Sequence, residues 1–484
     1  MVGLAGAALP AQAAAAGATV LSGTLSPAAT RAHFAGTLNR AGSVSFELVM
    51  SLRDAAGAAA LATAVSTPGS SEYHRYVTAA QWEARFSPSL SAIASTRSWL
   101  DQEGLQVGAI PADRMTIPVT GTVAQIDHAF STTLANYRVN GQTLRLASTN
   151  LTIPSALAGA VTGAVGLNQT LATAAGMTGA ATATPGAGNK SSQPPAFRNA
   201  PPCSTYYGQK VDTTLPEYGH GYPAQLPYQL CGYTPPQMRS AYDVASEVAS
   251  GDNGSGVTVA IVDAYASPTL FSDAQRYFQL NDPTHPITQS QFSELRASSF
   301  DDYQACGANG WWGEQSLDLE AVHSMAPGAT ILYVGAKNCE NGLLDSLRTV
   351  IDGHLAQVIT DSWGDDAGDL LDSASDRAAY DHLFMLADAT GISVMFSAGD
   401  DGDEFTTVGF VSADYPPSSP YITAVGGTSL QVGSTGARVG ELGWSTAKSV
   451  LLAVDQPSSP TRAPVAPTWR LVPPTAVMYG LDGG

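Results

Sequence analysis

The stretch GEQSLDLEAVHSMAPGAT, residues 313–330, decides how the chain is interpreted. Apolar side chains recur in it at helical spacing and Pro327-Gly328 ends the pattern, so it predicts one helix. Glu314 and Asp318 stand four residues apart and therefore share one face of that helix. Like charges at this spacing destabilise a helix, and the stretch contains no Lys or Arg to relieve them. The recurring apolar residues are Leu317, Leu319, Val322 and Met325.

Two carboxyl groups held this close can share a proton. The interaction then moves the pKa of one group up and the pKa of the other down, which is one way to obtain a general base that works in acid. The alternative is a solvated acidic face on a surface helix, and the spacing of Glu314 and Asp318 alone favours that alternative. The choice between them depends on the rest of the chain.

Length and charge suggest two or three domains of different character. The chain has 484 residues, of which 44% are hydrophobic and 13% charged. Its net charge of −19 argues against nucleic acid and anionic membranes as partners. The charge is uneven: up to residue 180 there are nine Lys+Arg against eight Asp+Glu, and beyond it 13 against 33. A nearly neutral part is thus followed by a strongly acidic one.

The four cysteines contain no Cys-x-x-Cys pair, so zinc or redox chemistry is not expected. Two disulfides between sequence neighbours, Cys203–Cys231 and Cys306–Cys339, are the simplest pairing, and other pairings stay open. Disulfides imply an oxidising compartment. Residues 1–19 are interpreted as a partial leader, because they are apolar and contain the small-x-small pattern Ala11-Gln12-Ala13 but lack a basic start. No apolar run reaches the length of a membrane span, so we expect secretion.

Three further segments follow the leader. Residues 20–170 mix helical and strand-like patterns, which predicts an α+β unit. Residues 171–200 consist mostly of Ala, Thr, Gly, Ser and Pro, which predicts a disordered, cleavable linker. From residue 201 to 484, apolar strands alternate with helical stretches, which predicts a parallel sheet with helices on both faces. The predicted buried strands are Val257–Val262, Ile331–Val334, Val358–Thr360 and Ile392–Phe396.

Functional sites in parallel sheets form at the carboxyl ends of strands. Asp400 follows one predicted strand on a glycine-flanked turn, and Asp263 ends another, although aspartates at such positions more often cap turns or helices. Residues 361–364, Asp-Ser-Trp-Gly, close a third strand and are placed to line a cleft. We expect His323 to be a packing residue. The chain contains no Gly-His-Gly-Thr-His pattern, so a subtilisin-type histidine triad is not expected.

Three ordered motifs make the interpretation specific. Gly313-Glu314-x-x-x-Asp318 with Met325-Ala-Pro-Gly-Ala329 resembles the signature helix of the sedolisin, or kumamolisin, family of serine-carboxyl peptidases. Ser397-Ala-Gly-Asp400 resembles the oxyanion turn of this family, and residues 415–428 resemble the loop and strand that follow it. The first 170 residues resemble the family's activation prodomain, notably at Tyr73-His74, Phe86-Ser87-Pro88, Trp99-Leu100 and Ala129-Phe130.

The resemblance implies a subtilisin-like parallel sheet preceded by an α+β, ferredoxin-like prodomain. It implies that Glu314 is the general base for a serine nucleophile, that Asp318 holds and tunes Glu314, and that a protonated Asp400 donates to the oxyanion. Both a carboxylate base and a neutral acid donor favour acidic pH. The resemblance further implies polypeptide substrates, the chain's own prodomain as intramolecular inhibitor and chaperone, a monomer, and calcium as the family's cofactor.

The end of the chain departs from the family pattern. The family's nucleophile lies in a late Gly-Thr-Ser turn that is followed by an aspartate-rich calcium loop, and neither follows before Gly484. We therefore expect a chain truncated before its nucleophile and lacking the calcium site. Ser429 is in a Gly-Thr-Ser, but within the motif that the family places on an earlier strand, and Ser445 and Ser449 are no better placed.

The main hypothesis is the precursor of a secreted, acid-acting serine-carboxyl endopeptidase. A non-catalytic relic that keeps the peptide-binding cleft, or acts as a prodomain-type binder, is the alternative from another class. A glycosidase that uses Glu314 and Asp318 is disfavoured, because carboxyls one helical turn apart point the same way and do not flank a sugar bond.

Overall fold

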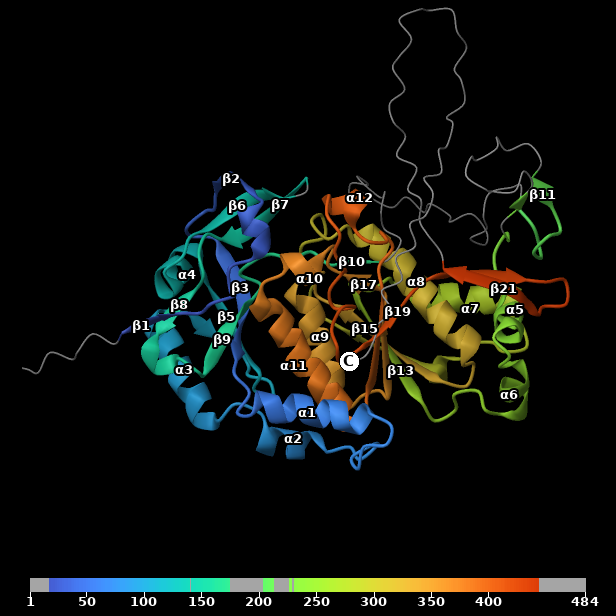
Figure 1. The fold of residues 1–484 in the computed structure, drawn as a ribbon, viewed down its shortest axis with the longest axis horizontal. Helices are drawn as coiled ribbons and strands as arrows, with labels where there is room; N and C mark the ends of the chain where they lie inside the picture. The colour runs from blue at the N-terminus through green and yellow to red at the C-terminus, as the bar shows by residue number, and fades with distance from the viewer. Residues whose placement is uncertain (1–16, 140, 175–202, 213–225, 229, 444–484) are drawn as a thin grey trace, which may run out of the picture. The chain divides into compact units, whose positions relative to one another are not determined.

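A computed structural model describes residues 17–139, 141–174, 203–212, 226–228 and 230–443 (Figure 1). The chain divides into two compact units. Unit 1 comprises Met1–Ala60, Thr78–Gln169 and Asp372–His382, and unit 2 comprises Leu61–Val77, Thr170–Leu371 and Leu383–Gly484. Most of the expected leader and the expected linker from residue 175 onward lie outside the described residues.

Unit 1 is built around an antiparallel four-stranded sheet in the order β4-β5-β3-β9. Helix α4 shows how local sequence fixes an element: Thr122 and Gln125 form a reciprocal capping box at its start, and Ser131 ends it in the left-handed conformation. Apolar residues of the sheet, α3 and α4 form one core, in which Phe46 and Phe130 meet edge to face. The elements are β1 Ala18–Val20, β2 His33–Thr37, β3 Ser43–Met50, α2 Ala79–Arg85, α3 Leu90–Gln102, β4 Gln106–Val107, β5 Thr116–Thr122, α4 Val123–Phe130, β6 Leu134–Val139, β7 Gln142–Ala147, β8 Thr152–Pro154 and β9 Val161–Val165. Helix α1, Ala55–Ser66, is divided between the two units after Ala60.

Unit 2 contains a six-stranded sheet in the order β14-β15-β13-β16-β18-β19, and all of its pairings are parallel. The four strands predicted from apolar runs lie in the middle of this sheet, so the predicted fold class is confirmed. The strands are β13 Thr258–Ala264, β14 Phe292–Arg296, β15 Thr330–Ala336, β16 Val358–Asp361, β18 Ser393–Ser397 and β19 Thr423–Val425.

Helices cover both faces of this sheet. Ile261, Tyr333 and Leu319 belong to the core that α7 and α8 form with β13 and β15. Helix α9 packs against the same two strands from the other side, and Figure 1 shows it across the sheet from α7 and α8. Burial on both faces explains why these strands are almost wholly apolar in sequence. The helices are α7 Leu270–Asn281, α8 Ala308–Met325 and α9 Asn341–Asp352. Helix α11, Ala374–Thr390, is divided between the two units after His382.

Smaller elements complete unit 2. Both predicted disulfides, Cys203–Cys231 and Cys306–Cys339, are formed. Within the described ranges, no helix is both long and apolar enough to cross a membrane. The remaining elements are β10 Thr173–Ala174, β11 Val211–Asp212, β12 Leu226–Pro227, α5 Pro235–Ala241, α6 Ala245–Ser250, β17 Trp363–Gly364, α10 Gly368–Leu371, α12 Phe405–Val408, β20 Thr428–Val432 and β21 Arg438–Gly443.

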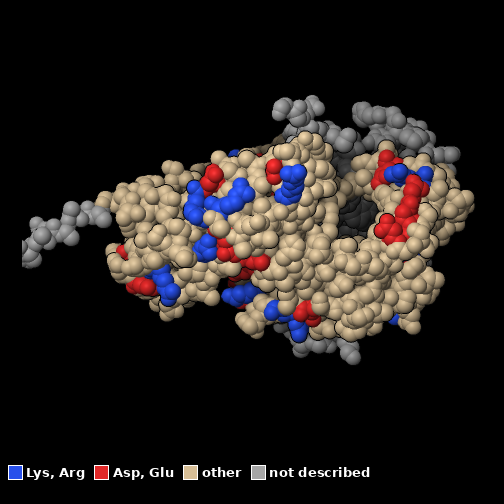
Figure 2. Space-filling model, turned by 90° about the horizontal axis from the view of Figure 1, so that it is seen from below, with Lys and Arg blue, Asp and Glu red and all other residues tan. Residues whose placement is uncertain are grey.

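Most of the face shown in Figure 2 carries neither acidic nor basic side chains, in keeping with a charged content of 13%.

Candidate active site

Helix α8 carries the predicted carboxyl pair into the interior of unit 2. Glu314 and Asp318 are 7% and 8% exposed, so the alternative of a solvated acidic face is wrong. Leu317, one of the four residues predicted to form the apolar face of this helix, is 59% exposed, so it does not belong to the buried face. Gln315 fixes the helix to the end of β13: its Nε2 donates to the Ala264 carbonyl at 2.9 Å, and its Oε1 accepts from the Ser267 N–H at 2.8 Å.

Ser362, which follows β16, contacts both members of the pair. Its Oγ donates to Asp318 Oδ1 at 2.7 Å, and its side chain is also hydrogen-bonded to Glu314. The sequence placed residues 361–364 at a cleft but gave no sign of this contact. The only available signal was the position of Ser362 directly after a buried strand.

Burial sets the protonation of the pair. It raises the pKa of Glu314 to about 9, with the negative charges of Asp318 and then Asp400 adding to the effect, while the hydrogen bond from Ser362 opposes it. Burial also raises the pKa of Asp318 to about 7, again opposed by Ser362. The expectation that one pKa would fall is therefore wrong. Desolvation raises the pKa of both buried carboxyls by more than their interaction lowers either one.

Two more carboxyls interact with the pair. Asp263, at the end of β13, is fully buried, and neither of its carboxyl oxygens has a hydrogen-bond partner. Asp361 Oδ1 accepts from the Val262 N–H at 3.2 Å. Burial raises the pKa of Asp263 well above its usual range, and Asp318, Glu314 and Asp361 raise it further. Burial likewise raises the pKa of Asp361. Asp263 thus belongs electrostatically to the carboxyl cluster, which sequence reasoning did not foresee.

Asp400 lies on the turn after β18, where Gly399 adopts a φ of +88°. Because its charge acts on the pKa of Glu314, the structure brings all three sequence-predicted site residues into one electrostatic neighbourhood. Asp400 also lines a pocket at the carboxyl end of the parallel sheet. The pocket is lined by Thr173, Ala174, Trp363, Gly364, Asp366, Ser397, Gly399, Asp400, Asp401 and Asp414.

A short strand of the chain, β10, forms part of the wall of this pocket. In β10, Thr173 and Ala174 pair antiparallel with Gly364 and Trp363 of β17. Thr173 Oγ1 donates to Asp366 Oδ1 at 3.0 Å. The first residues of the expected linker are therefore ordered, and two of them, Thr173 and Ala174, pair with β17 as an extended segment.

The remaining candidates lie elsewhere. His323 is buried edge to face against Phe278, so its predicted packing role is confirmed. Ser429 lies on β20, opposite Leu442 of β21, in a separate two-stranded sheet. Ser445 and Ser449 lie outside the described residues. In the part of the chain that the structure describes, no group of three His, Cys, Asp or Glu side chains is arranged to hold a metal ion.

Comparison with protein families matches two parts of the chain. Residues 30–170 match the pro-kumamolisin activation domain, and residues 304–463 match the subtilase family. The segment that matches the subtilase family follows the one that matches the activation domain, and it includes helix α8 and strands β15, β16, β18 and β19.

Two individual proteins are similar to most or half of the chain. Kumamolisin from Bacillus sp. (strain MN-32) is 29% identical over 246 residues, which is 49% of this chain and 42% of that protein. Sedolisin from Pseudomonas sp. (strain 101) is 25% identical over 408 residues, covering 82% and 61%. The resemblance drawn from the motifs is confirmed as a similarity: the chain is similar in sequence to kumamolisin and to sedolisin. It spans less than two thirds of the length of these relatives.

Two further comparisons are weaker in extent. Tripeptidyl-peptidase 1 from Rattus norvegicus is 31% identical over 217 residues, which is 41% of this chain and 35% of that protein. The structure of Pseudomonas sedolisin, a serine-carboxyl proteinase complexed with two molecules of pseudo-iodotyrostatin, aligns at 26% identity over 44% of this chain and 58% of that one, with a TM-score of 0.36.

Proposed function

We propose that the chain is the precursor of a secreted, acid-acting endopeptidase in which Glu314 is the general base, Asp318 positions it, and Asp400 donates a hydrogen bond to the oxyanion. The observation that carries the proposal is the buried Glu314–Asp318 pair, held by Ser362 and coupled to Asp400. A general base must be positioned, and helix α8 and the Ser362 contact position Glu314. Because burial raises its pKa to about 9, only the small ionised fraction of Glu314 accepts the proton of the nucleophile in acid.

The pairing of β10 with β17 supports a peptide substrate. An extended peptide on β17 uses its backbone groups for recognition and leaves its side chains to the pocket. The peptide bond to be cleaved would then lie toward Asp400, whose carboxyl group can donate to the developing oxyanion when it is protonated. Since β10 occupies this place in the precursor, we also propose that the residues after the activation domain block substrate access until they are cut.

None of the described serines is proposed as the nucleophile. Ser362 contacts both carboxyls, and we assign it a positioning role because it orients them toward each other. That the nucleophile is absent from residues 1–484 stays a prediction. So does calcium, whose site the family resemblance puts in the segment after the nucleophile.

Hydrolysis of a denatured protein at pH 4 tests the proposal. If the purified chain cleaves it, Glu314→Gln should lower kcat/KM by at least about a hundredfold, because the base is lost. Glu320→Gln is the matched control: this partly buried carboxyl on the same helix also has a raised pKa, about 8, caused first by burial and then by Asp273. Equal losses in both variants would contradict a specific role for Glu314.

Peptide binding without hydrolysis is the second candidate, and the β10–β17 pairing favours it. A chain cut after residue 174 and freed of its activation domain should then bind an extended peptide without cleaving it. Loss of binding when Gly364 is replaced by Pro, which removes an N–H from β17, would place the peptide on this strand.

A further inference from the structure

A second pair of carboxyls, Glu404 and Asp414, lies beside the turn that carries Asp400. Glu404 is 2% exposed and Asp414 is 7% exposed. Their side chains are hydrogen-bonded to each other. Glu404 Oε2 is buried and finds no N–H or O–H donor. A hydrogen bond between two carboxyl groups requires a proton on one of them, so this contact holds only while at least one group is protonated.

Asp414 is fixed at both of its oxygens. Oδ1 accepts from the Ala367 N–H at 3.1 Å. Oδ2 lies directly against the turn: a Cβ placed on Gly399 would be 2.2 Å from it. Gly399 has a φ of +88° and immediately precedes Asp400. The carboxyl of Asp414 therefore packs against the backbone at Gly399, the residue before Asp400.

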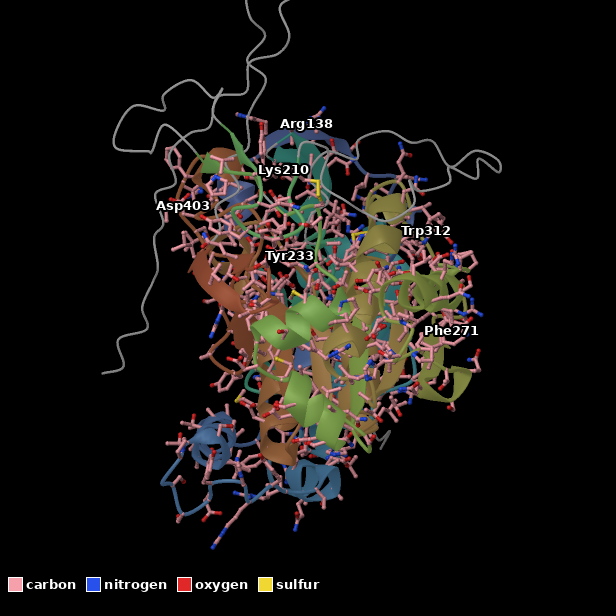
Figure 3. All side chains as sticks on the ribbon, turned by 90° about the vertical axis from the view of Figure 1, so that its right-hand side faces the viewer. Arg138, Lys210, Tyr233, Phe271, Trp312 and Asp403 are labelled. Atoms are coloured by element: carbon pink, nitrogen blue, oxygen red, sulfur yellow. A yellow bond between two sulfur atoms is a disulfide. The ribbon has the colours of Figure 1, made fainter. Side chains whose placement is uncertain are left out.

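Among the described residues, the charged groups that act on this pair are all acidic. Glu404 faces Asp414, Asp366 and Asp403. Asp414 faces Asp366, Glu404 and Asp400. Figure 3 labels Asp403 in the loop between β18 and α12, next to Glu404 in the chain. If Glu404 and Asp414 both ionised, two buried negative charges in contact would repel each other with no cation among these groups to offset them.

We propose that Glu404 and Asp414 are positioning residues that share a proton and, while they share it, hold the Gly399–Asp400 turn in place. Loss of the shared proton releases the turn. The step is a proton exchange with water and needs no other reactant. Any consequence for catalysis rests on the proposed function, because that function requires a fixed position for Asp400. The effect of the carboxyl pair on the turn itself does not depend on the proposed function.

Hydrogen exchange of the backbone amides of residues 398–401 tests this at pH 4.5 and pH 8.5, after correction for the intrinsic pH dependence of exchange. The wild-type turn should lose protection by at least about tenfold at the higher pH, because the carboxyl contact is broken there. Glu404→Gln should keep its protection, since its amide can donate to an ionised Asp414 without a shared proton.

Asp388→Asn is the matched control: burial raises the pKa of Asp388 to about 7, but no carboxyl neighbour contributes. It should lose protection at residues 398–401 as the wild type does. Wild-type protection that is unchanged between the two pH values, or loss in Glu404→Gln equal to that of the wild type, overturns the proposal. The readout does not need hydrolysis, so the inactive Glu314→Gln variant should still show the switch even if the proposed function fails.

Discussion

At the scale of single residues, Ser362 shows how one hydroxyl adjusts two acids. It lowers the pKa of both Glu314 and Asp318, against the larger effect of burial. Because a hydrogen bond to the ionised form stabilises that form, this serine moves the pair toward values at which a proton can leave. Its neighbour Asp361 does not make this contact, although both residues end the same strand.

Replacing Ser362 by Ala should therefore raise the pKa values of the pair further. A lost hydrogen bond of about 1 kcal/mol corresponds to roughly one pKa unit or less. Titration of the carboxyl carbons by NMR measures the change. Ser316→Ala is the control, because Ser316 is exposed on the same helix and donates to the Trp312 carbonyl. A pKa for Glu314 that is unchanged in Ser362→Ala would contradict the assignment.

At the scale of elements, the turn after β18 depends on Gly399 for two reasons. Its φ is positive, and its missing side chain leaves room for Asp414 Oδ2. Gly402, three residues further on, has a φ of +67° but open space where a Cβ would be. Substitution of Gly402 therefore introduces backbone strain alone, whereas substitution of Gly399 introduces both strain and a close contact with Asp414.

Gly399→Ala should lower the free energy of unfolding of unit 2 more than Gly402→Ala. A strained backbone costs about 1 kcal/mol, and overpacking adds about 1–3 kcal/mol at Gly399 alone. Chemical denaturation of both variants measures the difference. Equal costs would show that Asp414 moves aside freely, and would weaken its assigned support of the turn.

Helix α8 offers a second comparison at this scale. Leu319 is fully buried against β13 and β15, whereas Leu317 is 59% exposed. Leu319→Ala should cost about 2–5 kcal/mol through lost burial and the cavity left behind. Leu317→Ala should stay within about 0.5 kcal/mol. Denaturation midpoints report both values, and a small cost for Leu319→Ala would mean that α8 does not depend on this core.

The neighbouring tryptophans differ in burial in the same way: Trp311 is fully buried, and Trp312, labelled in Figure 3, is 41% exposed.

At the scale of the whole molecule, the buried carboxyls link stability to pH. Burial raises the pKa values of Glu314 to about 9 and of Asp318 to about 7, with Glu404 at about 8 and Asp414 at about 7 from burial and their acidic neighbours. In the unfolded chain such groups titrate near 4. Between these values the folded protein holds more protons than the unfolded one, so folding weakens as pH rises.

We therefore expect the melting temperature of unit 2 to be highest near pH 4 and to fall as pH rises from about 4 to about 9. Scanning calorimetry across this range measures the trend. The double variant Glu314→Gln, Glu404→Gln should show a shallower fall, because two of the responsible groups no longer titrate. A melting temperature that rises toward pH 8 would refute the directions of these pKa shifts.

The sequence by itself determined the elements and their class. Periodic apolar positions gave α8, uninterrupted apolar runs gave β13, β15, β16 and β18, and four cysteines gave the right pairing. The resemblance to the sedolisin family also pointed to Glu314, Asp318 and Asp400, whose charges interact in the structure. These features depend on residues close together in the chain, where periodicity and spacing carry the information.

Only the tertiary structure decided what covers each face. Periodicity shows that Glu314 and Asp318 share a side of a helix, but it does not show whether water or protein lies against that side. Burial raises both pKa values of the pair, whereas one was expected to fall. The fold also brings Asp263 and Ser362 close to the pair, packs Asp414 against Gly399 and pairs β10 with β17. Each of these contacts joins residues far apart in the chain, and desolvation, which dominates the chemistry of the site, exists only once they meet.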